Sequence, residues 1–262
     1  MDFIKMHGLG NDFVVLDLLA REAPDDPAQL AREKCDRHFG VGADGLALIL
    51  PSDRADARMR IFNPDGSEPE MCGNAVRCVA KYLFEAGRAR GETVSVETGA
   101  GIKDMRVFLA DGKVVRVSVD MGIPLEAGRA EFRIAGTRAE FLRVSMGNPH
   151  AVTYSLYPED GVFYRYAPRL EKSPAFPEGA NIEFCQVLDR NHIRVRVWER
   201  GAGPTLACGT GAGASFFAGV KSGLIDRKAV VTLPGGDLEY ELTDAGHAVM
   251  TGPAAEAFRG TF

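Results

Sequence analysis

Apolar and polar residues alternate along several short stretches of the chain, and this period of two is typical of half-buried β-strands. The alternation is clearest in residues 58–62 (Arg-Met-Arg-Ile-Phe) and 192–198 (His-Ile-Arg-Val-Arg-Val-Trp). Short apolar runs bounded by turn-forming residues predict further strands. These expected strands cover residues 3–6, 13–19, 46–50, 93–96, 105–109, 114–119, 229–233 and 238–242.

Apolar residues recur with helical spacing in two places, each directly after a Cys-Gly pair. After Cys72 the spacing continues until Gly87, a residue type that commonly ends helices. After Cys208 the corresponding positions hold small residues until about Gly223. We therefore expect two helices, each beginning at a cysteine and each buried in the middle of its own lobe.

A third helix is predicted near the start of the chain. Asp26 suits an N-cap position and Pro27 suits the first helical turn. We expect this helix to continue to about His38, after which glycine-rich residues 40–45 turn the chain into the strand at 46–50.

The two Cys-Gly segments belong to an internal duplication. At an offset of 136 or 137 positions, matching residues recur in the same order in both halves of the chain. The matches include Gly10-Asn11 with Gly147-Asn148, Phe39 with Phe176, Gly42-Ala43 with Gly179-Ala180, Arg58 with Arg194, and Cys72-Gly73 with Cys208-Gly209. The chain is therefore expected to form two similar lobes.

The expected fold is of the α+β class, with two lobes related by a pseudo-twofold axis. Each lobe should be a mixed, mostly antiparallel β-sheet or barrel wrapped around a central helix. We place the N-terminal lobe at residues 1–120, with Cys72, and residues 252–262 are candidates to complete it. The C-terminal lobe, with Cys208, should cover residues 121–251.

Composition favours a soluble protein with a small-molecule partner. The chain has 262 residues, of which 45% are hydrophobic and 26% charged, and its formal net charge is -5. It has no block of Lys and Arg to form the concentrated positive field that nucleic acids and anionic membranes require. Its apolar runs are too short to span a bilayer, and its first residues lack the features of a signal peptide. We expect a cytoplasmic location with no nucleic-acid or membrane partner.

Five cysteines are present: Cys35, Cys72, Cys78, Cys185 and Cys208. Their odd number and wide spacing argue against a disulfide framework. No CxxC, HxxxH or HExxH motif is present, so we expect no metal site. Free cysteine usually fills space in a protein core, and we assign that role to Cys35, Cys78 and Cys185.

Cys72 and Cys208 have a physical reason to be reactive. The unpaired N–H groups at a helix N-terminus carry a partial positive charge, which favours a thiolate and lowers the pKa of the thiol. We expect both thiols to titrate near neutrality. Gly73 and Gly209 have no side chains, so they leave the first helical turn open to a carboxylate.

Two such thiols facing one bound anion suit stereochemical inversion at a carbon that carries hydrogen. One sulfur removes the proton from one face while the other returns a proton to the opposite face. Negative charge then spreads onto the adjacent carboxylate, which the helix ends stabilise. No electron-sink cofactor is required, and we expect none.

Specific motifs extend over nearly the whole chain. They include residues 3–13 (FIKMHGLGNDF), 62–67 (FNPDGS), 71–74 (MCGN), 146–150 (MGNPH), 176–181 (FPEGAN), 198–203 (WERGAG) and 208–211 (CGTG). In combination they resemble the motifs of diaminopimelate epimerase, a cofactor-independent amino-acid epimerase of lysine and cell-wall biosynthesis. The chain departs from the family pattern at Pro204, where many members have Glu, and at Gly45, where some have Gln.

The resemblance implies roles for individual residues. Cys72 and Cys208 would be the acid and base residues, and Gly73, Asn74, Gly209 and Thr210 would donate to substrate carboxylates. The distal amino-acid group would be bound by Asn11, Asn63, Asn148, Asn181, Glu199 and Arg200. A zwitterionic group needs one anion and one cation, which Glu199 and Arg200 supply. A homodimer is implied by the resemblance alone.

His150 has an independent claim, because an imidazole titrates near neutrality and can tune a nearby thiol. Glu199 is a second candidate for that role. A purely structural role for His150 is an equal alternative. Asp44 and Asp65 lie in turn sequences, and we expect them to cap backbone N–H groups.

Three other functions remain open. Racemases and epimerases of proline, hydroxyproline or histidine share the two-cysteine architecture, although the proline enzymes usually carry His after the first Cys-Gly, where this chain has Asn74. A thiol redox protein would use Cys72 and Cys208 as a switch. A carboxylate-binding protein without turnover would keep the helix ends and tolerate loss of both thiols.

Overall fold

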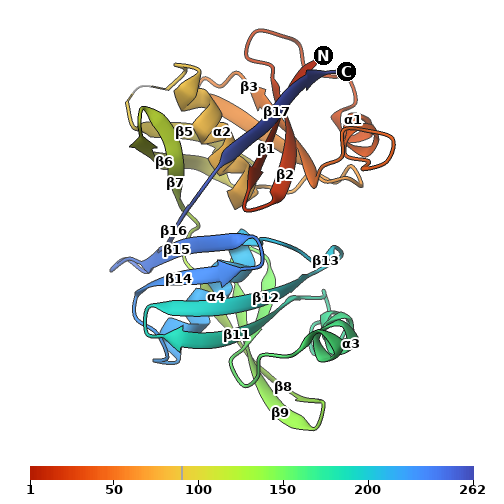
Figure 1. The fold of residues 1–262 in the computed structure, drawn as a ribbon, viewed down its shortest axis with the longest axis vertical. Helices are drawn as coiled ribbons and strands as arrows, with labels where there is room; N and C mark the ends of the chain where they lie inside the picture. The colour runs from red at the N-terminus through yellow and green to blue at the C-terminus, as the bar shows by residue number, and fades with distance from the viewer. Residues whose placement is uncertain (90) are drawn as a thin grey trace. The chain divides into compact units, whose positions relative to one another are not determined.

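A computed structural model describes residues 1–89 and 91–262 of the chain (Figure 1). Its contacts divide the chain into two compact units. Unit 1 consists of Met1–Asp120 together with Thr251–Phe262, and unit 2 consists of Met121–Met250. The last twelve residues therefore belong with the first 120.

Unit 1 contains eight strands and two helices among its described residues. Their bounds are β1 Asp2–Gly8, β2 Asn11–Asp17, α1 Pro27–Lys34, β3 Gly45–Leu50, β4 Ala57–Phe62, α2 Gly73–Glu85, β5 Thr93–Thr98, β6 Gly101–Ala110, β7 Lys113–Asp120 and β17 Ala255–Thr261. The strands pair in the order β17-β1-β2-β3-β4-β5-β6-β7. Two of these pairings, β2 with β3 and β4 with β5, are parallel, because a helix lies between the strands in the sequence.

Unit 2 repeats this arrangement. Its elements are β8 Leu125–Ile134, β9 Thr137–Ser145, β10 Pro149–Thr153, α3 Asp160–Glu171, β11 Asn181–Asp189, β12 His192–Glu199, β13 Gly203–Pro204, α4 Gly209–Lys221, β14 Lys228–Leu233 and β15 Gly236–Leu242. Strand β16, Ala248–Gly252, begins in unit 2 and its last two residues belong to unit 1. Strands β8 to β12, β14 and β15 pair in sequence order. The parallel pairs are again those separated by a helix, β10 with β11 and β12 with β14.

The equivalence extends to the end of the chain. Strand β17 lies antiparallel to β1, just as β8 lies antiparallel to β9 in unit 2. In Figure 1 the blue β17 runs beside the red β1, and the two termini lie close together. The C-terminal strand thus gives unit 1 the partner that β8 gives to unit 2.

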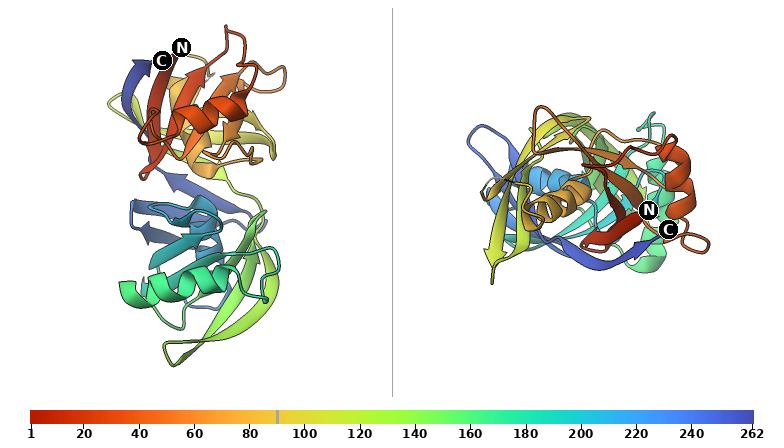
Figure 2. Two further views of the ribbon diagram at one scale, coloured as in Figure 1. Left: turned by 90° about the vertical axis from the view of Figure 1, so that its right-hand side faces the viewer. Right: turned by 90° about the horizontal axis from the view of Figure 1, so that it is seen from above.

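A central helix forms the core of each unit. Helix α2 contacts β1, β2 and β4 to β7, and helix α4 contacts β9 to β12, β14 and β15. Every residue of α2 from Gly73 to Lys81 is buried, and α4 is lined with Gly, Ala and Ser, which let strands approach it closely. The expected α+β fold, with strands around a central helix, is confirmed. Helices α1 and α3 lie outside the strands of their units (Figure 2).

Two helices differ from expectation. Helix α1 begins as predicted, with the Asp26 side chain accepting from the N–H of Gln29 at 2.9 Å, but it ends at Lys34 rather than near His38. It stops because the Asp36 carboxylate accepts from the N–H groups of His38 and Phe39, which forms a turn. Helix α3 is absent from the sequence predictions. It contains Pro168, a residue that argues against a helix interior.

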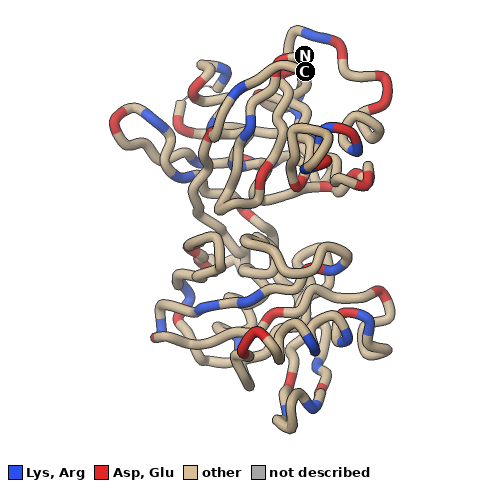
Figure 3. Tube along the Cα trace, turned by 45° about the vertical axis from the view of Figure 1, so that its right-hand side comes forward, with Lys and Arg blue, Asp and Glu red and all other residues tan. Residues whose placement is uncertain are grey.

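Charged residues of both signs are interspersed along both units (Figure 3). Within the described residues, no helix combines the length and the apolar character needed to cross a bilayer.

Candidate active site

In unit 1, Cys72 is the N-cap residue of helix α2 and is partly buried. Its Sγ points toward Oδ1 of Asn11 at 4.0 Å, and the Asn74 side-chain amide donates to the same oxygen at 2.9 Å. Asn11 begins β2 directly after the turn from β1, so the β1–β2 hairpin and the first turn of α2 bring these three residues together. All three were predicted as site residues.

Asn11 is held in place by a charged cluster that the sequence did not reveal. Its Nδ2 donates to Oδ2 of Asp44 at 2.9 Å. Arg37 pairs with both Asp44 and Asp12, at 2.7 and 2.8 Å, and Lys5 pairs with Asp12 at 2.7 Å. Asp44 also accepts from the N–H of Asp12, so its expected role in capping a backbone group is confirmed.

The charges in this cluster perturb one carboxyl strongly. Burial by itself would raise the pKa of Asp12, but the hydrogen bonds and positive charges of Arg37 and Lys5 outweigh burial and lower that pKa to about 2. Asp12 is therefore ionised at neutral pH and ties β1 and β2 to the loop that follows α1.

Asn63 is more loosely connected to this half of the site. Its side-chain amide donates to Oγ of Ser67 at 2.9 Å, so it closes its own loop after β4. Asp65 accepts from the N–H of Ser67 at 2.8 Å and is a backbone cap, as expected. Gly73 is buried, and its carbonyl accepts from Arg77.

Arg77 was missed by the sequence analysis as a residue of interest. It is completely buried, and its Nε donates to the carbonyl of Pro253 at 3.3 Å. This bond links the second turn of α2 to the segment that returns from the end of the chain. Gly8 leaves room for the guanidinium, because a Cβ at that position would lie 2.7 Å from Nη2 of Arg77.

In unit 2, Cys208 is the N-cap residue of helix α4 and is almost completely buried. Its Sγ accepts from the N–H of Gly211 at 3.3 Å and lies 3.6 Å from Oγ1 of Thr210. The Gly209 carbonyl accepts from the hydroxyl of Tyr240, which fixes the first turn of the helix from the other side.

The pKa of Cys208 contradicts the expectation of titration near neutrality. Burial raises the pKa of this thiol far above its ordinary value, and the negative charges of Glu199 and Glu183 raise it further. The hydrogen bonds from Thr210 and Gly211 lower it by less. The sequence revealed the favourable helix end but not the desolvation, and in this structure desolvation is the larger effect.

His150 lies in a chain of hydrogen bonds that reaches Cys208. Its Nε2 is 2.9 Å from Oδ1 of Asn148, and the Asn148 Nδ2 donates to Oγ1 of Thr210 at 3.3 Å. Its Nδ1 is 2.7 Å from Oε1 of Glu183, a completely buried carboxyl on β11. Glu183 was not among the predicted residues, although an acidic residue within the apolar run Ile182-Glu183-Phe184 was a visible signal.

Asn181, Glu199 and Arg200 lie at adjoining strand ends. Asn181 Nδ2 donates to the carbonyl of Pro149 at 2.9 Å, and its Oδ1 accepts from the N–H of Arg200 at 3.0 Å. The Arg200 guanidinium is exposed and donates to the carbonyl of Glu178 at 2.8 Å. The Glu199 carboxylate accepts from the hydroxyl of Thr205 in the loop that leads to Cys208.

The model of the family described as diaminopimelate epimerase matches residues 3–125 and 142–256 of the chain. Curated relatives agree over the full length. A protein of Moorella thermoacetica named diaminopimelate epimerase is 50% identical, covering 100% of this chain and 99% of the relative. One of Methanococcus maripaludis with the same name is 45% identical, covering 99% of both.

This chain belongs to the diaminopimelate epimerase family.

Solved structures with low sequence identity share the fold of this family. A predicted epimerase from Pseudomonas aeruginosa superposes with a TM-score of 0.77 at 17% identity, covering 100% of this chain and 98% of the other. A probable proline racemase from Agrobacterium radiobacter gives 0.74 at 18% identity, covering 100% and 92%. A hydroxyproline epimerase from Agrobacterium vitis gives 0.74 at 19%, covering 99% and 91%.

The other three cysteines of this family member are core residues, as expected. Cys35, Cys78 and Cys185 are all buried. Burial raises the pKa of Cys35 to about 11 and that of Cys78 to about 12, and it raises the pKa of Cys185 still further. These thiols are protonated at neutral pH.

Each unit contains a cavity. A cavity of about 380 Å³ in unit 2 is lined by Asn148 and His150 together with Arg143 and residues 176–180. It borders the hydrogen-bond chain that leads to Cys208.

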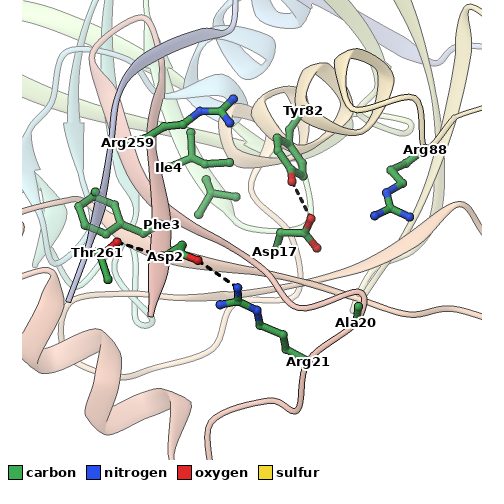
Figure 4. Close-up of a pocket in the computed structure, with 12 residues that line it drawn as sticks. Asp2, Phe3, Ile4, Asp17, Ala20, Arg21, Tyr82, Arg88, Arg259 and Thr261 are labelled. Carbon is green, nitrogen blue, oxygen red and sulfur yellow. Dashed lines mark hydrogen bonds and ion pairs between the residues drawn. The ribbon is translucent and has the colours of Figure 1, made fainter.

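A cavity of about 520 Å³ in unit 1 lies between β1, β2 and β17 and contains none of the predicted site residues (Figure 4). Several of its polar side chains are paired, two of the pairs within the lining. Arg21 pairs with Asp2 at 3.0 Å and Tyr82 donates to Asp17 at 2.6 Å (Figure 4). Arg259 pairs with Glu256, which lies outside the lining. Among the described residues, no three His, Cys, Asp or Glu side chains gather as a metal site.

Proposed function

We propose that this chain is a cofactor-independent epimerase that interconverts LL- and meso-2,6-diaminopimelate, with Cys72 and Cys208 as its two acid and base residues. The observation that carries the proposal is that each unit begins its central helix with a cysteine at the N-cap. Duplicated units that each deliver one thiol fit a reaction with one acid and one base.

In this reaction a thiolate takes the proton from the α-carbon, so the C–H bond breaks and its electron pair remains on carbon. The other thiol then gives its proton to the opposite face of the same carbon. One S–H bond forms and one breaks, so the protein ends with the same number of protons. The reverse reaction exchanges the roles of the two sulfurs.

Helix N-termini stabilise the intermediate of this reaction. Negative charge moves from the α-carbon onto its carboxylate, and the N–H groups of α2 and α4 near Gly73, Asn74, Gly209 and Thr210 are donors suited to that group. The raised pKa of Cys208 supports its role as the acid. A thiol that holds its proton at neutral pH is ready to act as the acid, and its conjugate thiolate is a strong base.

Recognition of the second amino-acid group falls to six residues. Arg200 has an exposed guanidinium that suits the distal carboxylate, and Glu199 suits the distal ammonium. Amide side chains both donate and accept, so they suit a ligand with both kinds of group. The remaining residues assigned to this role are Asn11, Asn63, Asn148 and Asn181.

We also propose that the enzyme acts in the cytoplasm, in the synthesis of lysine and cell-wall precursors, and that it forms a homodimer. The family resemblance supports these statements. Size-exclusion chromatography with light scattering at several concentrations tests the dimer, and a mass of one chain throughout would reject it.

The decisive test of the activity is incubation with LL-diaminopimelate in deuterated water. We expect the meso isomer to appear with deuterium at the inverted α-carbon, because the returning proton comes from a thiol that has exchanged with solvent. Formation of the meso isomer without deuterium would reject the two-base mechanism. No conversion of LL-diaminopimelate, combined with exchange at the α-carbon of proline, hydroxyproline or histidine, would assign the other substrates.

A further inference from the structure

A buried acid-base pair lies behind Cys208, outside the residues that bind or react in the proposed function. His150 has a relative exposure of 1% and Glu183 of 0%. The ring contacts Glu183 through Nδ1 at 2.7 Å and Asn148 through Nε2 at 2.9 Å. Both partner atoms are oxygens.

These two contacts fix the number of protons in the pair. The Asn148 Oδ1 only accepts, so Nε2 must carry a hydrogen. At Nδ1 one further proton is then shared with Glu183, either as an imidazolium donating to a carboxylate or as a carboxylic acid donating to the ring nitrogen. In both forms Nε2 is a donor and the pair as a whole is neutral.

The surroundings of Glu183 favour a neutral pair. Its second oxygen, Oε2, is buried without a hydrogen-bond partner among the described residues, and an unbalanced charge there would be strongly disfavoured. Burial raises the pKa of Glu183, while the positive charge and hydrogen bond of His150, and the backbone N–H of Ala151, oppose that rise. The other ionisable groups that face it are Glu199 of β12, Cys208 at the start of α4 and Cys185 of β11.

The donor at Nε2 sets the direction of the bonds that follow. Because Asn148 accepts from His150 with Oδ1, it turns Nδ2 toward Oγ1 of Thr210. The Thr210 hydroxyl accepts that bond and keeps its own hydrogen for Sγ of Cys208, 3.6 Å away. With the N–H of Gly211, two donors then face the sulfur, an arrangement that stabilises its thiolate.

Unit 1 has no counterpart of this pair. In the β10–β11 ladder Val152 lies opposite Glu183, and in the matching β2–β3 ladder Val15 lies opposite Ala47. The position of His150 corresponds to Phe13. Phe13 and Ala47, which occupy the positions of His150 and Glu183 in unit 1, are both buried and apolar. The equivalent positions of β2 and β3 therefore hold no acid-base pair.

We propose that Glu183 is a positioning residue for Cys208, which acts through His150, Asn148 and Thr210 to hold a hydrogen-bond donor on the sulfur. This inference rests on the proposed function only in treating Cys208 as an acid or base. The role belongs to the Cys208 half-site alone.

The first test needs no substrate, so its result is independent of the proposed activity. In full-length protein labelled with ¹⁵N-histidine, NMR reports which ring nitrogens carry hydrogen, and loss of a signal in H150N identifies His150 among the five histidines. We expect Nε2 of His150 to carry a hydrogen at neutral pH, as its contact with Oδ1 of Asn148 requires. An unprotonated Nε2 at neutral pH would overturn the proposal.

The second test compares E183Q with E183M. The Gln amide can donate to Nδ1 and preserve the hydrogen on Nε2, whereas Met matches the length of Glu but makes no hydrogen bond. We expect kcat for E183M to be at least about tenfold below that of E183Q, the scale of losing one hydrogen bond to a charged sulfur. A packing role predicts the opposite order, because an apolar isostere of a buried charge is often neutral or stabilising.

Thermal unfolding of both variants separates folding from function. We expect E183M to be folded and slow, and equal kcat values for the two variants would overturn the proposal. If E183M does not fold, the NMR experiment on wild type and E183Q decides the matter, because E183Q must also keep Nε2 protonated.

Discussion

The Sγ of Cys208 accepts a hydrogen bond from the N–H of Gly211 at 3.3 Å, so this cysteine caps the helix that it begins. Cys72 makes no such capping bond in helix α2. Equivalent positions in the duplicated units therefore differ in capping, and the pKa of Cys208 is raised by burial and by the negative charges of Glu199 and Glu183.

We predict that Cys208 reacts slowly with iodoacetamide at about pH 8 and that its rate still rises above about pH 9, because only the thiolate reacts. Glu199→Gln removes a negative charge that raises the pKa of Cys208, so it should increase the rate at about pH 8 by roughly threefold to tenfold. Mass spectrometry of the Cys208 peptide measures the rate of alkylation. Glu241→Gln, an exposed site in the same unit, is the control, and an unchanged or lower rate in Glu199→Gln would contradict the assigned electrostatics.

The positions of both cysteines were predictable because the signals are local. A Cys-Gly pair followed by helical apolar spacing locates an N-cap, and the structure confirms it at Cys72 and Cys208. The end of α1 was misplaced by about one turn, although Asp36 and Gly40 carried the signal for a stop.

The pair of Glu183 and His150 could not be predicted in the same way. The two residues are 33 positions apart, and the parallel ladder of β10 and β11 brings them together. A pattern of apolar residues indicates that both strands are buried but not which side chains meet. The expectation that Cys208 titrates near neutrality was wrong for the same reason. The burial and the acidic neighbours that raise its pKa arise from long-range contacts.

Removal of either reactive thiol should abolish epimerisation. We expect Cys72→Ala and Cys208→Ala each to lower kcat by at least about a thousandfold, within the range contributed by general acid-base groups. The measurement is conversion of LL-diaminopimelate to the meso isomer. Cys78→Ala, in the same helix as Cys72, is the matched control and should retain activity, because its thiol only fills the core. Normal turnover by either single mutant would exclude the two-base mechanism.

Arg200 should govern substrate affinity rather than the chemical step. Lys cannot bind a carboxylate bidentately, so Arg200→Lys should raise KM by about tenfold to a hundredfold, the effect of losing roughly 1.5–3 kcal/mol of charged hydrogen bonding. We expect kcat to change much less. Arg194→Lys, at an exposed position of strand β12, which ends just before Arg200, is the control. A large fall in kcat at unchanged KM would show that Arg200 does not bind the distal group.

Asp12 should couple the stability of unit 1 to pH. Its pKa is lowered to about 2 in the folded protein, against about 3.9 in an unfolded chain, so its contribution is present above about pH 4 and is lost as the pH falls toward 2. The ion pairs with Arg37 and Lys5 are the cause. We expect Asp12→Asn to remove about 2 kcal/mol at neutral pH and to flatten the loss of stability between about pH 4 and about pH 2.

Unfolding by urea at several pH values tests the role of Asp12. The exposed Asp53→Asn should change stability little across the same range. An acid-induced loss of stability equally steep in Asp12→Asn and wild type would assign the transition to other carboxylates.

Gly211 should be required for the arrangement around Cys208 although it lies in a helix. A Cβ at this position would be 2.9 Å from Oε1 of Glu183 and 3.2 Å from Sγ of Cys208. Gly211→Ala gains helix propensity of about 1 kcal/mol, but it must displace the buried carboxyl and the sulfur. We expect a folded protein with kcat lowered by at least about tenfold, since a shift near 1 Å at a reacting group has large effects. Gly161→Ala in α3, where a Cβ meets no atom within 4 Å, is the matched control and should stabilise the protein without loss of activity. Because the two substitutions are chemically identical, wild-type kcat in Gly211→Ala would show that the close contact between Glu183 and the first turn of α4 has no part in catalysis.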